Sequence, residues 1–143
     1  MDLKQLIIDT KSVWMEYPGK EGFEVEIANL SRNELIKMRK ECTITKFDRT
    51  IRAPMEEVDD EKFSKKFTDA TVKNWKGLTL DHLQTLILID TTDKDLSTEV
   101  PYSKDNARLL VQGSSEFDAW LNGVVFDLDN FRDRRERKTV AEA

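Results

Sequence analysis

The residue types that could carry out chemistry are few in this chain. Its one histidine, His82, lies in the leucine-rich segment LTLDHLQTLIL at 78–88, and no serine nucleophile motif is near it. A hydrolytic triad needs a nucleophile, a histidine base and a carboxylate held together. We therefore expect His82 to be a structural or surface residue, and we predict no catalytic residue.

Metal coordination is poorly supplied as well. His82 and Cys42 are the only histidine and cysteine, so a structural zinc site with four such ligands cannot be built. A calcium loop in the acidic run 90–99 fails at two positions, since Thr98 stands where glycine is required and Lys104 where a bidentate glutamate is required. We expect no metal site, and the acidic run is predicted to be a solvated loop.

The sequence also lacks a clear motif for phosphate binding or for acid–base catalysis. The five glycines do not have the spacing of a P-loop or of a dinucleotide-binding turn. Neighbouring carboxylates such as Asp59 and Asp60 are frequent in an acidic chain and carry no specific catalytic signal. The sequence therefore favours a non-enzymatic binding protein without a cofactor.

Composition and charge restrict the partners. The chain has 143 residues, of which 38% are hydrophobic and 36% charged, as expected for one folded domain. A net charge of -5 disfavours binding to nucleic acid phosphates and to anionic membranes. The locally basic run RDRRERK at 132–138 is small, and cations are expected near a helix C-terminus. We expect no nucleic-acid partner and no membrane partner.

The first residues and the cysteine content favour the cytoplasm. In MDLKQLIIDTKSVW the apolar run is short and is broken by Asp9 and Lys11, so we expect neither a secretion signal nor a membrane span. Cys42 is a single cysteine without an internal disulfide partner, which suits a reducing compartment.

The elements that would position a partner site begin with a predicted β-hairpin. One strand is expected to use the apolar run 6–8 and Val13, and the turn lies at 17–22. The second strand carries Phe23, Val25 and Ile27 in alternation with glutamates. Because strand side chains alternate between faces, these three residues are predicted to face the core.

The first predicted helix spans 32–42 and has the clearest start signal. Ser31 and Glu34 have the spacing of a capping box. After this helix, residues 43–47 are predicted to be extended and 48–58 to form a loop or a loose hairpin.

Glycines and capping residues delimit the remaining predicted helices. A second helix is expected from Asp59 or Asp60 through Trp75, with Gly77 ending it. The others are a short helix capped by Thr79, a helix opened by Pro101 and Ser103 and closed by Gly113, and a last helix from Ser114 or Ser115 to Phe131.

The last predicted helix has the most regular apolar stripe. Most of this stripe is expected to pack in the core, because leaving it in water would forfeit much of a domain's stability. Phe126 lies off the stripe and is predicted to be an exposed contact. The stripe consists of Phe117, Trp120, Leu121, Val124, Val125, Leu128 and Phe131.

These elements predict an α+β, helix-rich fold. An N-terminal β-hairpin is expected to be followed by about five helices around one core. Residues 1–131 are predicted to form a single domain, and residues 132–143 a basic C-terminal tail that frays.

Four segments of the chain resemble a known family. In order and spacing they are similar to segments of the tail assembly chaperones of long-tailed bacteriophages (siphophages) and related prophages. In that family a strand runs into a Leu-Ser-Arg capped helix, a Trp-Lys-Gly-Leu turn follows a helix, and a Pro-Tyr-Ser capped helix precedes a final amphipathic helix. The segments lie between Phe23 and Arg132 and read FEVEIANLSRNELIKMRKECT, VKNWKGLT, VPYSKDNARLL and SSEFDAWLNGVVFDLDNFR.

The resemblance implies a non-enzymatic chaperone that binds the tape measure protein and keeps it soluble. Such a protein also helps to recruit the major tail protein as the tail tube assembles, with self-association left open. It is expected in the host bacterial cytoplasm and not in the mature virion. The alternative is a structural tail-completion or connector protein of the virion, which would remain in the particle.

Binding a helical, partly apolar partner requires exposed apolar side chains. The chain has several apolar positions on turns and helix faces beyond the expected needs of the core. We predict partner contacts, as a hypothesis, at Trp75, Leu78, Leu86, Ile87, Ile89 and Phe126.

Overall fold

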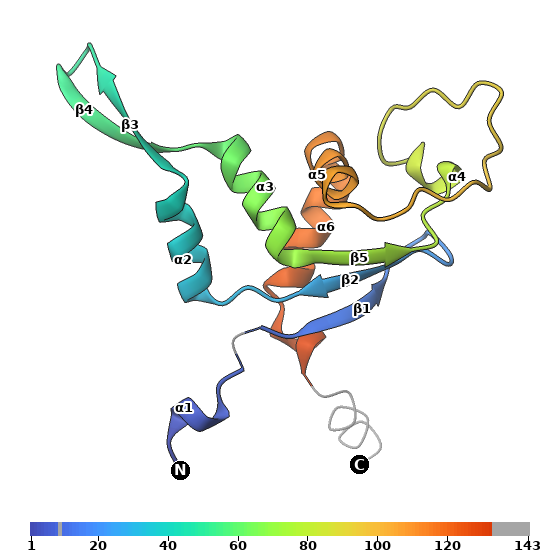
Figure 1. Ribbon diagram of the computed structural model, residues 1–143, viewed down its shortest axis with the longest axis horizontal. Coiled ribbons are helices and arrows are strands. Elements are labelled where there is room, and N and C mark those ends of the chain that lie inside the picture. Colours follow the sequence, from blue (N-terminus) through green and yellow to red (C-terminus); the bar gives the residue numbers. More distant parts are fainter. Residues whose placement is uncertain (9, 133–143) are drawn as a thin grey trace.

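A small antiparallel sheet with helices against one face organises the chain (Figure 1). The computed structural model describes residues 1–8 and 10–132. The predicted α+β class is confirmed. In chain order the elements are α1 Leu3–Leu6, β1 Ser12–Glu16, β2 Glu24–Ala28, α2 Arg32–Glu41, β3 Thr43–Asp48, β4 Ala53–Val58, α3 Asp60–Thr71, β5 Val72–Lys76, α4 Leu80–Leu83, α5 Lys104–Gly113, α6 Ser115–Val125 and the 3-10 helix η1 Leu128–Phe131.

The strand β2 lies at the centre of the sheet. Within the described residues the strand order is β1-β2-β5, and both pairings are antiparallel. Phe23, Val25 and Ile27 have no exposed surface, so the predicted alternation places this set of side chains in the core. The strand β1 begins only at Ser12; the run 6–8, predicted to belong to it, lies outside it and is exposed.

The strand β5 replaces the predicted end of the second helix. The helix α3 begins at Asp60, with Asp59 as its N-cap, and ends at Thr71. The following residues pair with β2 through a bulge, at which the register shifts between Glu26 and Ile27. A bulge inserts one extra residue into a strand. Val72 and Trp75, three positions apart, are therefore both buried on a strand.

The last helix is shorter than predicted. It ends at Val125, and Phe126 is its C-cap. The Asn130 side chain donates to the Val124 carbonyl (3.1 Å), which satisfies a free acceptor at this helix end. The stripe is therefore interrupted, since Leu128 is 70% exposed while Phe131 returns to the core through η1.

The β3–β4 hairpin extends away from the sheet and helices (Figure 1). Residues 48–58, predicted as a loop or a loose hairpin, supply its tip and the paired strand β4. The Asp48 carboxylate accepts from the Thr50 amide at 2.8 Å and orders the tip. Phe47 and Met55 are 66% and 51% exposed, so no element of the described chain covers them.

The predicted C-terminal tail is described only at its first residue. Arg132 pairs with Asp129 (3.0 Å), and residues 133–143 lie outside the described residues. Within the described part of the chain, no helix is long and apolar enough to cross a membrane.

Candidate partner-binding cleft

The floor of an apolar cleft forms where β5 leaves the sheet. Trp75 and Leu78 are 5% and 1% exposed and lie on either side of Gly77. Gly77 has a φ of +74°, and a Cβ at this position would fall on the carbonyl oxygen of Gly22. This close approach to the β1–β2 turn requires glycine, and it fixes the direction of the chain below the cleft.

The first wall is the short helix α4 and the turn that follows it. Thr79 caps the helix by accepting from the His82 amide at 3.2 Å. The His82 ring Nε2 donates to the Glu21 carbonyl (2.9 Å), so His82 fixes α4 to the β1–β2 turn. Ile87 closes this wall against α5, because a Cβ added to Gly113 would lie 3.2 Å from the Ile87 Cγ2.

The second wall is α5 together with the segment leading into it. The Val100 amide donates to the Leu78 carbonyl (2.7 Å), and the Trp75 indole donates to the Val100 carbonyl (2.9 Å). Ser103 caps α5 through the Asn106 amide at 3.0 Å, as predicted for this serine. The Asn106 side-chain NH2 donates to the Pro101 carbonyl at 3.0 Å.

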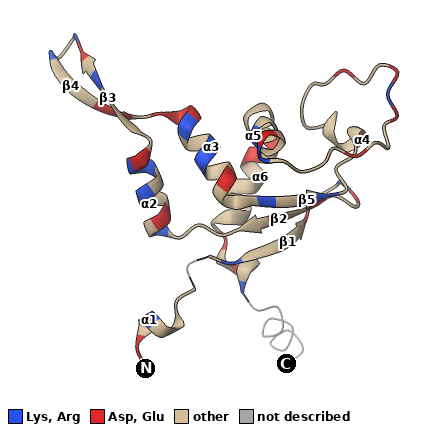
Figure 2. Ribbon diagram, in the orientation of Figure 1, with Lys and Arg blue, Asp and Glu red and all other residues tan. Residues whose placement is uncertain are grey.

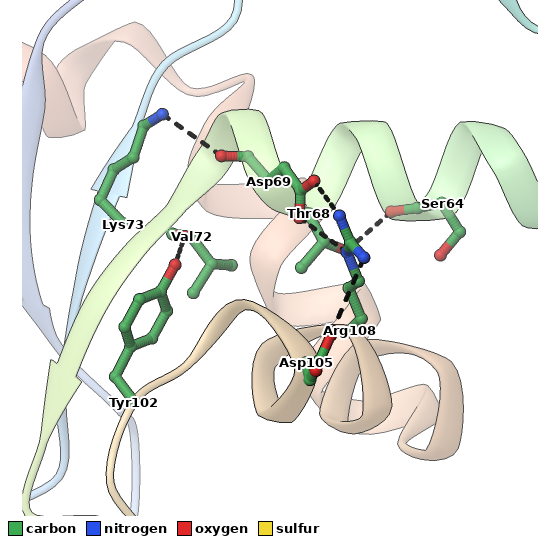
Figure 3. Close-up of polar contacts among 8 residues, drawn as sticks. All are labelled: Ser64, Thr68, Asp69, Val72, Lys73, Tyr102, Asp105 and Arg108. Carbon is green, nitrogen blue, oxygen red and sulfur yellow. Dashed lines mark hydrogen bonds and ion pairs between the residues drawn. The ribbon is translucent and has the colours of Figure 1, made fainter.

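A charged network holds α5 against α3 (Figure 3). Both oxygens of Asp69 accept from Arg108, with a distance of 2.9 Å from the Nε atom to Oδ1. Asp105 lies on the other side of the guanidinium at 3.9 Å. Bidentate carboxylate–guanidinium pairs set geometry as well as energy. Since Leu109 and Leu110 follow Arg108, this pair also positions the second wall.

The network shifts the ionisation of two of its members. The hydrogen bonds from Arg108 to Asp69 raise the pKa of the guanidinium. Burial raises the pKa of Tyr102, and the negative charge of Asp69 adds to this rise. The Tyr102 hydroxyl donates to the Val72 carbonyl at 2.9 Å, so the neutral phenol is the form that the fold uses.

The resulting cleft has a volume of about 140 Å³ and a mainly apolar lining. Within the described chain, Asn106 is its one polar lining residue, and no titratable side chain lines it. This arrangement suits binding of an apolar group and offers no acid, base or nucleophile. The lining residues are Trp75, Leu78, Leu83, Ile87, Val100, Asn106, Leu109 and Leu110.

The structure brings three of the predicted contact residues together in this cleft. Trp75, Leu78 and Ile87 all line it. The prediction places Trp75, Leu78 and Leu86 beyond the needs of the core, whereas the structure buries all three. The first two form the floor of the cleft, and Leu86 is 9% exposed and packs in the core.

The other two predicted contact residues lie outside the cleft. Ile89 is half-buried at the start of the loop after α4. Phe126 is 47% exposed, as predicted, and its ring lies 6.0 Å from that of Phe67 on α3. It remains a prediction that these two residues contact a partner.

Sequence reasoning missed one exposed residue that lines the cleft, Leu109. Leu109 is 63% exposed and lines the cleft, and Leu88, next to Ile87, is fully exposed. We call these two exposed residues, Leu109 in the lining and Leu88 one position after the lining residue Ile87, the rim leucines. A signal was present for Leu109, since the inward positions of its helix are Ala107, Leu110 and Val111 and it lies off this stripe.

A second, wider cleft of about 630 Å³ lies beside the N-terminal segment. Its lining is largely polar and charged, with Arg32, Glu34 and Lys37 on one side and Ile7 on the other. Glu34 is already engaged in the capping box of α2. The smaller cleft is therefore the better candidate for an apolar partner.

Neither metal chemistry nor a relative adds to this picture. In residues 1–8 and 10–132, no three His, Cys, Asp or Glu side chains gather closely enough to hold a metal ion. Comparison with family models, curated proteins and solved structures finds no match.

Proposed function

We propose that this chain is a tail assembly chaperone of a long-tailed bacteriophage. It binds the tape measure protein in the host cytoplasm, keeps it soluble and helps to recruit the major tail protein. The observation that carries the proposal is the apolar cleft with its two rim leucines. A tape measure protein is long, helical and partly apolar, and it would present side chains that such a cleft accommodates.

Two of the segments that resemble the family build this cleft. VKNWKGLT supplies Trp75 and Leu78, and VPYSKDNARLL supplies Val100 and the α5 wall. The resemblance therefore falls on residues that lie together in space, although about 20 positions separate the two segments in the sequence. This coincidence supports a common binding role for both segments.

The size of the cleft suits a contact that can be displaced. Burial of one large apolar side chain contributes on the order of 1.5 to 3 kcal/mol, which gives a weak single contact. Repeated along a long partner, such contacts would hold it in solution together. The major tail protein could then displace the chaperone one contact at a time.

A structural tail protein is the second candidate. The observation that favours it is the β3–β4 hairpin, whose exposed Phe47, Ile51 and Met55 could become buried in an assembled particle. A chaperone leaves before the virion is complete, whereas a structural protein stays in it. The two functions therefore differ in where the protein is found.

The test is co-expression with the tape measure protein encoded beside this chain. We expect the tape measure protein to become soluble and to co-purify, and purified particles to lack this chain. An insoluble tape measure protein, together with this chain in purified particles, would replace the chaperone by the structural protein.

A further inference from the structure

We infer that the helix bound by the cleft is amphipathic and basic. One bulky apolar side chain enters the cleft, and lysine or arginine side chains beside it face the acidic loop between α4 and α5. The inference rests on the proposed function, because it takes the cleft as the partner site. It goes further by specifying the chemistry of the bound segment.

The volume of the cleft sets the size of what enters it. At about 140 Å³ it is smaller than pockets for metabolites, which span roughly 300 to 1,000 Å³. An apolar cavity of about 150 Å³ holds one benzene-sized group. A single leucine, isoleucine or phenylalanine side chain therefore matches the cleft.

The rim leucines indicate that the occupant extends beyond one side chain. Leu109 stands on α5 in the lining of the cleft, and Leu88, one residue after the lining residue Ile87, is exposed as well, so the apolar surface available to a partner is larger than the cleft itself. A helix presents apolar side chains at spacings of three and four on one face. One of them can fill the cleft while its neighbours cover the rim leucines.

The charge around the cleft selects the flanks of that helix. Residues 81–105 carry six carboxylates against two lysines, a net charge of -4 out of -5 for the whole chain. Figure 2 shows acidic positions spread along the ribbon of the loop between α4 and α5. In the sequence, Lys94 lies among them. The carboxylates are Asp81, Asp90, Asp93, Asp95, Glu99 and Asp105.

Two of these carboxylates have a lowered pKa, and two others are exposed without an ion pair to a described residue. Amide and hydroxyl hydrogen bonds lower the pKa of Asp90, through Thr92, and of Asp95, through Ser97. Asp93 and Glu99 are exposed, and their side chains form no ion pair with any described residue. Loop backbone is fixed to α4, since the Leu80 amide donates to the Thr98 carbonyl at 2.9 Å.

The opposite charge is found elsewhere on the molecule. The helix α2 carries four basic residues against two acidic ones, and it lies apart from α4 and α5, the helices beside the cleft (Figure 2). A basic helix would be repelled there and attracted to the cleft. Charge therefore selects the face on which the partner docks, while the apolar side chain supplies most of the affinity.

The test uses two designed helical peptides that share one leucine stripe. One has lysine flanks and the other glutamate flanks, and their binding is followed by fluorescence anisotropy. We expect the basic peptide to bind at least about tenfold more tightly, and to weaken as salt rises from low to high concentration. Equal affinity for the two peptides, or no binding of the basic one, would overturn the inference.

Variants then locate the site. Leu109→Glu should abolish binding of the basic peptide, and Leu109→Ser, which adds no charge, should weaken it at least about fivefold.

A double variant tests the contribution of the acidic loop. Neutralising Asp93 and Glu99 (Asp93→Asn with Glu99→Gln) should weaken binding of the basic peptide by about three- to tenfold. The matched control neutralises Asp60 and Glu56 (Asp60→Asn with Glu56→Gln), at the start of α3 and on β4, and should change affinity less than twofold. The inference would be contradicted if the Leu109 variants bound the basic peptide with unchanged affinity, or if both double variants changed that affinity equally.

The same variants separate this inference from the proposed function. If the peptides behave as expected but the tape measure protein does not bind, the proposed function fails and the basic-helix site stands. If the tape measure protein binds with unchanged affinity after Asp93 and Glu99 are neutralised, the function stands and the inference fails.

Discussion

The two β-hairpins of this molecule have the same antiparallel pairing but opposite relations to the core. The β1–β2 hairpin is joined by a third strand, β5, and the inward side chains Phe23, Val25 and Ile27 have no exposed surface. The β3–β4 hairpin remains a two-stranded sheet, and Phe47 at its end is 66% exposed. An isolated two-stranded hairpin is marginally stable in water, whereas added strands and a packed face give stability.

The difference shows that stability and the candidate site share one part of the fold. Gly77, Trp75 and Val100 join the three-stranded sheet to the cleft. The β3–β4 hairpin contributes few core contacts and can change with little cost. We therefore expect substitutions near β2 and β5 to have large effects on unfolding, and substitutions in β3–β4 to have small ones.

The largest effect is expected from removing a large side chain beside β2. Phe23→Ala should lower the free energy of unfolding by roughly 3 to 5 kcal/mol, because Phe23 is fully buried. Phe47→Ala, the matched change in the other hairpin, should cost less than about 0.5 kcal/mol. Urea unfolding followed by circular dichroism measures both. Similar losses for the two variants would remove the distinction between the hairpins.

The next effect concerns the close approach below the cleft. Gly77→Ala should destabilise by roughly 2 to 4 kcal/mol, because its φ of +74° disfavours alanine and the new Cβ meets Gly22. Gly19 has a similar φ of +77° with no atom near its Cβ position, so Gly19→Ala should cost only about 1 kcal/mol. Thermal unfolding of both variants isolates the packing contribution. Equal costs would mean that the approach to Gly22 does not matter.

A smaller effect depends on pH. Burial, together with the hydrogen bond to Glu116 (2.7 Å) and its charge, raises the pKa of Tyr17 well above the usual 10.0. Its contribution is therefore complete below pH 10.0 and is lost as the pH rises through the higher folded value. Tyr17→Phe should cost about 1 kcal/mol at neutral pH and should reduce the alkaline loss, leaving the smaller part that comes from the raised pKa of Tyr102. Urea unfolding of the two proteins is compared between about pH 8 and 11, the range in which a tyrosine hydroxyl ordinarily begins to ionise. An alkaline loss of unchanged size in the variant would show that Tyr17 is not its main source.

The smallest effect is expected at the tip of β3–β4. Arg52 has a φ of +53°, a conformation that glycine adopts without steric cost. Arg52→Gly should change the free energy of unfolding by no more than about 0.5 kcal/mol, since the hairpin adds little to the core. Chemical denaturation of this variant checks the expectation. A shift larger than that of Tyr17→Phe would show that β3–β4 unfolds as part of the core.

The sequence predicted the elements whose signals are local. Ser31 with Glu34, Thr79 and Ser103 cap the helices that begin after them, because a cap depends only on the next three residues. The burial of Phe23, Val25 and Ile27 followed from alternation within five residues. These features need no knowledge of distant parts of the chain.

The sequence failed where distant contacts decide. The bulge in β5 places the buried Val72 and Trp75 three positions apart, a spacing that a helix face also allows, so the sequence pattern assigns Trp75 to the preceding helix. The end of α6 depends on Asn130, six residues beyond Val124. The cleft could be predicted only in part, because its walls pair segments that local patterns cannot bring together.

The most direct test of the binding site compares two variants for capture of the tape measure protein. Each of Leu109→Glu and Phe126→Glu is co-expressed with it, and the soluble, co-purified fraction is measured beside wild type. We predict that Leu109→Glu leaves the tape measure protein insoluble, and that Phe126→Glu weakens capture less while both variants stay folded. Capture that survives Leu109→Glu, or a larger loss with Phe126→Glu, would contradict the assignment of the cleft as the chaperone's binding site.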